Sequence, residues 1–201
     1  MYQANTTDGD DLLTPEGFDR AVRRRLPTSV HSAQKPQYWA ERFEDLMLQL
    51  ANDSEQDLRC QNLRTAGEWM NVDHVFVSEN RYDAFPLIAV EHENGNLVSR
   101  NGELPDPRVH CIEWAFWKVL TMSAHLAVCV AYPWGRTDEE KRTALTVFEK
   151  MACGFRDTYE RHPRVLLMLG WWDENAYAKP LSDLYESYVF TKAGKFELLR
   201  D

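Results

Sequence analysis

The sequence predicts an α/β protein in which a mixed central β-sheet is flanked by helices. Segments with apolar residues at helical spacing alternate with short apolar runs of strand length, which is the pattern of such folds. The chain has 201 residues, of which 44% are hydrophobic, so it can bury the core of one domain. Its longest apolar runs, near 126–132 and 165–169, are too short for a membrane span.

The N-terminal segment, residues 1–35, is expected to form an arm with one short basic helix, and residues 36–201 to form the α/β domain. The helix is predicted to begin after Thr14, an N-cap residue that precedes Pro15. An arginine cluster of this helix can bind phosphates or an acidic partner, but a solvated helix face is the more usual explanation. The cluster consists of Arg20, Arg23, Arg24 and Arg25.

The middle of the chain predicts one helix followed by three antiparallel strands. Apolar residues recur at helical spacing over 37–51, whereas 52–66 show no clear pattern. The first strand is expected to begin within 67–71. The β-branched and aromatic residues of 72–78 favour a second strand, and the apolar run that opens 87–93 favours a third.

An apolar helix is predicted over 109–124, with Phe116 and Leu120 buried, because apolar residues occur at both helical phases. The run LAVCVAY at 126–132 is typical of a strand that is buried on both faces.

A long helix is predicted from Thr137 to about residue 162, since Thr137 followed by Glu140 forms a capping-box pattern. A further buried strand is expected at 164–171. The segment 180–201 is expected to pack on the edge of the sheet as a strand or a helix.

The cysteines and the charge bear on compartment and partners. The four cysteines are widely spaced without a C-x-x-C pair, which favours buried free thiols over a zinc site: Cys60, Cys111, Cys129 and Cys153. The polar start has no apolar signal segment, so we expect a cytoplasmic protein without membrane attachment. A net charge of −9 counts against a general nucleic-acid binder, but a nuclease needs only a local basic patch.

Three carboxylates are the strongest candidates for chemistry. Asp73 opens one predicted strand, and Glu91 and Glu93 close the next, where they share one face because side chains alternate along a strand. If the strands pair, the three carboxylates converge and require a cation to offset their repulsion. Mg²⁺ or Mn²⁺ suits such oxygen ligands and can activate water against a phosphate.

The motifs V72-D-H-V-F-V and I88-A-V-E-H-E resemble the PD-(D/E)xK nuclease superfamily, which includes many restriction endonucleases. Its core runs helix, three strands, helix, strand, with an Asp at the start of the second strand and (D/E)-x-K at the end of the third. The resemblance covers roughly residues 37–132. It implies a restriction endonuclease-like core in which Asp73 and Glu91 hold the metal.

Two positions depart from the family pattern. Val72 replaces the proline, a common variation, and Glu93 replaces the lysine that positions or activates water. A glutamate there is similar to members in which a third carboxylate is proposed as the general base. Alternatively, Lys118 on the following helix reaches the site, as relocated lysines do in some members. The substitution can also mark a lineage that has lost cleavage.

Other polar residues have weaker claims on the site. Glu44 on the first domain helix can add an acidic ligand, as in some members of the family, although an exposed helix-face charge is the more usual role. His92 is expected to point away from Glu91 and to serve as a structural hydrogen-bonding residue. Asp83 is expected to cap a turn. Several tryptophans could stack on bases, but most are expected in the core: Trp114, Trp117, Trp134, Trp171 and Trp172.

The expected function is Mg²⁺- or Mn²⁺-dependent hydrolysis of DNA phosphodiester bonds. Two alternatives stay open. The chain can be a non-catalytic member of the same fold that binds protein or nucleic acid as a regulator or subunit, which the charge of −9 and the missing lysine favour. It can also be an unrelated α/β protein in which the acidic strand end is a coincidence.

Overall fold

The computed structural model describes residues 11–26, 36–53, 58–62, 72–78, 86–93, 111–133, 137–170 and 185–199. Within them the helices are α1 (Pro15–Arg25), α2 (Pro36–Asn52), α3 (Cys111–Thr121) and α4 (Asp138–Tyr159). The strands are β1 (Leu58–Asn62), β2 (His74–Ser78), β3 (Ile88–Glu93), β4 (Leu126–Ala131), β5 (Val165–Gly170), β6 (Tyr185–Phe190) and β7 (Phe196–Leu198). None of the helices described is long and apolar enough to cross a membrane.

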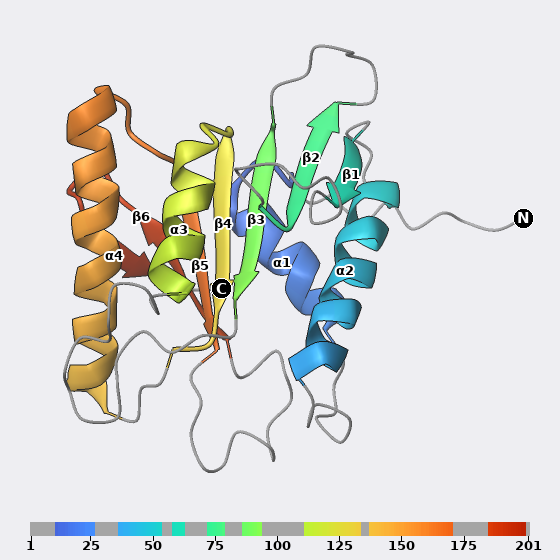
Figure 1. Ribbon diagram of the computed structural model, residues 1–201, viewed down its shortest axis with the longest axis horizontal. Helices are drawn as coiled ribbons and strands as arrows, with labels where there is room; N and C mark the ends of the chain where they lie inside the picture. Colours follow the sequence, from blue (N-terminus) through green and yellow to red (C-terminus); the bar gives the residue numbers. More distant parts are fainter. Residues whose placement is uncertain are drawn as a thin grey trace, which may run out of the picture.

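The strands form one mixed sheet whose spatial order, β1 to β7, is their order in the chain (Figure 1). Strands β1, β2 and β3 are antiparallel, β3, β4 and β5 are parallel, and β6 and β7 return to antiparallel pairing. Helices α3 and α4 make the crossovers that parallel neighbours require. The predicted α/β class, with a mixed sheet flanked by helices, is therefore confirmed.

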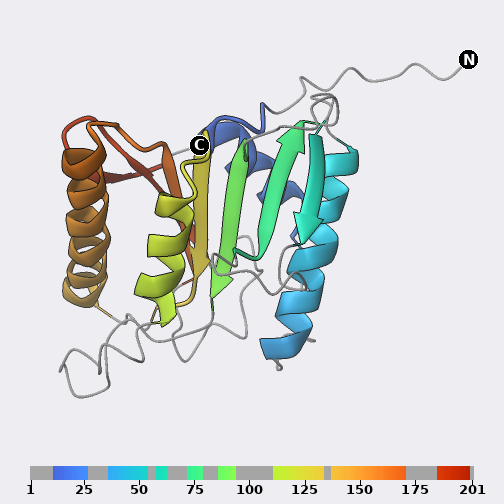
Figure 2. The same ribbon diagram turned by 45° about the horizontal axis from the view of Figure 1, so that its top comes forward.

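The sheet separates two apolar cores because successive side chains of a strand point to opposite faces. Helices α1 and α2 cover one face, over residues such as Phe76 and Val90. Helices α3 and α4 cover the other, over residues such as Ala89 and Leu167 (Figure 2). Phe116 and Leu120 of α3 are buried in this second core, as the sequence predicts.

Helix α1 packs into the first core through Phe18 and Val22 and does not stand apart from the sheet. Thr14 caps it through its side chain, as predicted. The expectation of a solvated arginine face is wrong for Arg23, whose guanidinium contacts both oxygens of the buried Asp19 and the Oγ of Ser187 on β6.

The capping box of α4 is confirmed. The Glu140 backbone N–H donates to Thr137 Oγ1 at 3.2 Å, and the Thr137 N–H donates to the Glu140 carboxylate at 2.9 Å. These two bonds satisfy amide donors that have no partner within the helix, so they fix where α4 begins.

The structure corrects or refines three expectations, and others lie outside the described residues. Strand β1 occupies 58–62, where the sequence shows no clear pattern, and 67–71 lies outside the described residues. The C-terminal edge is a pair of short strands. The core assignment is wrong for Trp114 and Trp117, which are 57% and 42% exposed. Asp83 and the other three tryptophans of the base-stacking candidates lie outside the described residues.

Candidate active site between the sheet and helix α3

Asp73 and Glu91 lie side by side on the face of the sheet that α3 covers. Strands β2 and β3 pair His74 with Val90, so one further step of this register sets Asp73 opposite Glu91. The Asp73 N–H donates to Glu91 Oε2 at 2.9 Å, and the His92 N–H donates to Asp73 Oδ2 at 3.0 Å. Both acidic residues are nearly inaccessible, with exposures of 4% for Asp73 and 2% for Glu91.

Lys118 brings a positive charge to this pair from α3. The helix turns Phe116 and Val119 into the core, and Lys118 extends from its flank to donate to Glu91 Oε1. Both side chains of this ion pair are mostly buried. The structure therefore brings together Asp73, Glu91 and the lysine that the sequence offered as a substitute for the family lysine.

The pKa of Glu91 is raised to about 7, first by burial and then by the neighbouring Asp73 carboxylate. The hydrogen bond and charge of Lys118, with the Asp73 N–H, act in the opposite direction but do not cancel the rise. Lys118 thus offsets only part of the free energy that is needed to keep the buried Glu91 carboxylate ionised. Added positive charge at this point would favour the ionised form.

We expect the protein to lose stability as pH rises through 7 in metal-free buffer. The pKa of Glu91 is raised in the folded state from 4.5 to about 7, so its contribution is fully present below pH 4.5 and is lost above 7. The shift corresponds to a loss on the order of 3 kcal/mol in the free energy of unfolding. Urea unfolding of wild type and Glu91→Gln from pH 5 to pH 8.5 measures it. Parallel pH profiles of the two proteins would contradict the assignment.

Cys129 and Glu93 lie close to the same point. Cys129 pairs in register with Glu91, and burial raises the pKa of its thiol well above 9. The charges of Glu91, Glu93 and Asp73 raise this pKa further, while Lys118 opposes them. Sequence analysis placed Cys129 in a buried strand but not beside the acidic pair, because the parallel register between β3 and β4 cannot be read from periodicity.

His92 and Glu44 belong to the opposite side of the sheet. The prediction for His92 is confirmed: its ring stacks on Phe43 of α2 at 4.5 Å, and its Nε2 lies 2.9 Å from the Tyr132 hydroxyl. Glu44 follows Phe43 on α2, the helix that packs on this face. The sheet therefore separates Glu44 from Asp73 and Glu91, which speaks against the less usual alternative that it adds a ligand to them.

The expected convergence of three carboxylates is not found. Among the described residues, which include Asp73, Glu91 and Glu93, no group of three or more His, Cys, Asp or Glu side chains is arranged to hold a metal ion. The adjacent pair of Asp73 and Glu91 still fits Mg²⁺ chemically, because this ion commonly uses one or two carboxylates and completes its shell with water and substrate phosphate. Burial and the Asp73 carboxylate raise the pKa of Glu91, so a bound cation would favour its ionised form.

The fold and the site define a mixed α/β protein with a buried acidic pair and a lysine on the face below α3. Comparison of the chain with protein-family models, with curated proteins and with solved structures found no match.

Proposed function

We propose that the protein is a Mg²⁺- or Mn²⁺-dependent nuclease that hydrolyses phosphodiester bonds of DNA. One observation carries the proposal: Lys118 of α3 contacts Glu91 directly beside Asp73, on one face of the sheet. Two carboxylates and a lysine at one point are the groups that metal-assisted phosphoryl transfer to water uses.

Each residue of this trio has a distinct role. Asp73 and Glu91 would hold the divalent ion, which would supply Lewis-acid chemistry to a phosphoryl oxygen and to a bound water. Lys118 orients the attacking water and offsets the negative charge that develops on the phosphate. Glu93, at the end of β3, is half-buried near the same site, and it is the candidate to accept a proton from the water.

The element order supports a restriction endonuclease-like core. Helix α2, strands β1 to β3, helix α3 and strand β4 follow one another as in the PD-(D/E)xK superfamily. Asp73 directly precedes the second strand of this series, and Glu91 lies on the third. Lys118, on the helix that follows, takes the place of the lysine that Glu93 replaces.

A second candidate is a non-catalytic member of the same fold that binds a protein or nucleic acid. The contact between Lys118 and Glu91 favours it, because this ion pair partly neutralises the carboxylate without any metal. The net charge of −9 also limits the affinity for a polyanion.

A thermal-shift and cleavage experiment tests the proposal. We expect Mg²⁺ or Mn²⁺ to raise the melting temperature of the wild type, because a ligand bound only by the folded state stabilises it, by about 2.7 kcal/mol at one hundred times Kd. The same ions should support cleavage of plasmid DNA. Asp73→Asn should lose both effects, while Glu186→Gln, whose partner is Lys141 on α4, should keep them.

Metal-dependent stabilisation without cleavage of any DNA substrate would favour the non-catalytic candidate. A wild type that shows neither effect would contradict the metal site itself.

A further inference from the structure

The outer surface of α3 carries an exposed aromatic pair. The indoles of Trp114 and Trp117 stack on each other, with ring centroids 4.8 Å apart and planes 12° from parallel. Among the described residues, five large hydrophobic side chains are exposed, and three of them lie on α3 and α4: these two and Tyr159. Exposed aromatic side chains on neighbouring helices make this surface a candidate for binding a partner.

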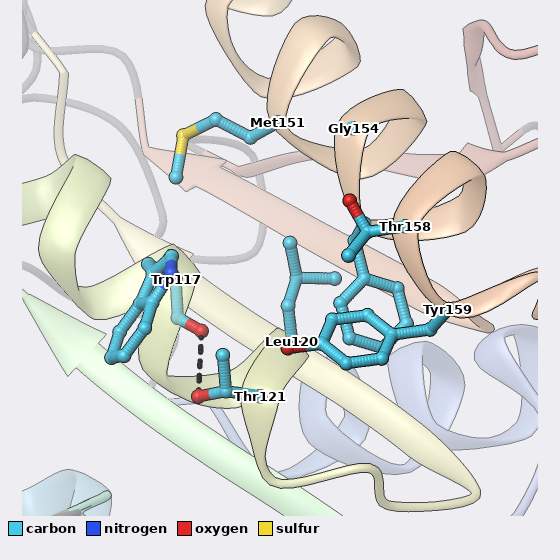
Figure 3. A pocket seen from close by; sticks show the side chains of 8 residues that line it. Trp117, Leu120, Thr121, Met151, Gly154, Thr158 and Tyr159 are labelled. Carbon is cyan, nitrogen blue, oxygen red and sulfur yellow. Dashed lines mark hydrogen bonds between the residues drawn. The ribbon is translucent and has the colours of Figure 1, made fainter.

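Trp117 also forms one wall of a groove between α3 and α4. Figure 3 shows Trp117 and Thr121 on α3, with Met151, Thr158 and Tyr159 on α4. The groove has a volume of about 280 Å³. This is just below the usual range of ligand pockets, roughly 300–1,000 Å³, so the groove suits a single planar ring system better than a large ligand or a packed peptide helix.

The aromatic pair is next to the proposed active site. Trp117 directly precedes Lys118, and Trp114 lies one turn before it, at the i, i+4 spacing that makes residues neighbours on a helix surface. A strand whose phosphate lies at Lys118 would therefore have the aromatic pair of the same helix beside it.

For DNA binding, the charge of the chain favours a contribution that is not electrostatic. A net charge of −9 opposes the approach of a polyanion and limits what phosphate contacts can supply. Stacking of bases on aromatic side chains supplies affinity without positive charge, and it needs unpaired bases whose faces are accessible.

We propose that Trp114 and Trp117 stack on the bases of single-stranded DNA that flank the phosphate at Lys118, and that the groove beside Trp117 receives one of these bases. This inference rests on the proposed function, since it makes the substrate a single strand or a single-stranded segment of a duplex. A protein partner or a second copy of the chain is the competing occupant.

Fluorescence anisotropy with two labelled oligonucleotides tests the inference. One is oligothymidylate of about 12 nucleotides, within the usual site sizes, and the other is an abasic strand with the same number of phosphates. In Ca²⁺ buffer and in EDTA, we expect wild type to bind the thymidylate roughly 10-fold or more tightly than the abasic strand. This ratio should persist as salt increases, because the two strands share their electrostatic contribution.

Variants test whether the preference for thymidylate comes from the aromatic rings of Trp114 and Trp117. The double substitution Trp114→Ala, Trp117→Ala should weaken thymidylate binding roughly 10- to 100-fold and leave the abasic strand unaffected. The double substitution to Phe should restore part of the loss, since it keeps aromatic faces. Leu48→Ala removes an exposed apolar side chain from α2, on the other side of the sheet, and should change neither affinity.

Three results would overturn the inference: equal binding of both strands by wild type, no binding of either strand, or a change of oligomeric state in the alanine variant, which would assign the surface to a second copy of the chain. A failure of this inference can be distinguished from a failure of the proposed function. If the protein prefers thymidylate but does not cleave DNA, the stacking surface is supported and the nuclease proposal is contradicted. If it cleaves DNA without this preference, the nuclease proposal is supported and the stacking surface is contradicted.

Discussion

Glu91→Gln is expected to reduce metal-dependent DNA cleavage by about 10²-fold or more while the fold is kept. Glutamine has the same shape and keeps one carbonyl oxygen, but it lacks the charge that balances a divalent cation. The charge that develops on the phosphoryl group then loses its counter-ion, and electrostatic losses of this kind typically have effects of that size. Cleavage of plasmid and oligonucleotide substrates with Mg²⁺ and with Mn²⁺ measures the change.

Stability distinguishes a lost ligand from a damaged fold. In metal-free buffer at pH 8, the free energy of unfolding of Glu91→Gln should hold or rise, because the ionised carboxylate is buried beside Asp73. The amide oxygen can still accept the Asp73 N–H, although the amide nitrogen then faces Lys118. Equal cleavage by both proteins would show that Glu91 is not a metal ligand of the reaction.

Lys118→Met should reduce cleavage by a similar factor and also destabilise the protein. The pKa of Glu91, about 7, lies one unit below pH 8, so this carboxylate can take up a proton when its partner is removed. The expected loss at pH 8 is therefore about 1–3 kcal/mol, below the 3–5 kcal/mol of buried pairs that cannot neutralise. At pH 5 the loss should be smaller, because Glu91 is already protonated there.

Two controls accompany Lys118→Met. Lys118→Arg keeps the charge and should retain most of the stability at pH 8. Lys141→Met breaks a more exposed ion pair with Glu186, which should be worth no more than about 1 kcal/mol and should not depend on pH in this way. A loss for Lys118→Met that is equal at pH 5 and pH 8 would show that the ion pair with Glu91 does not determine it.

The elements that the sequence predicts well have a strong local signal. Strands β4 and β5 are apolar over nearly their whole length, and β2 and β3 each contain a run of three apolar residues. All four occur within one or two residues of the expected bounds. The start of α4 follows from side chains three residues apart, Thr137 and Glu140. By contrast, β1 is the polar segment LRCQN, so its strand conformation depends on pairing with β2, which no local pattern encodes.

In the candidate site too, the features that depend on local pattern were predicted, and those that depend on tertiary packing were not. Alternation along a strand was enough to place Glu91 and His92 on opposite faces. The meeting of Lys118 with Glu91 depends on how α3 lies across β3, so the sequence could offer it only as one of two alternatives. The exposure of Trp114 was missed because an aromatic residue in an apolar helix is usually buried, and its neighbours gave no sign of which side faces water.

The identity of spatial order and chain order in the sheet has a consequence for biosynthesis. Each strand pairs with the strand that was made just before it, so the sheet can grow from β1 as the chain emerges from the ribosome. The antiparallel pairs close the shorter connections, whereas the parallel pairs of β3 with β4 and of β4 with β5 must wait for the crossover helices α3 and α4. The contacts of α1 with β6 differ, since Arg23 and Ser187 are 164 residues apart. Asp19 and Arg23 can pair within α1 early, but their hydrogen bonds to Ser187 form only after β6 is made.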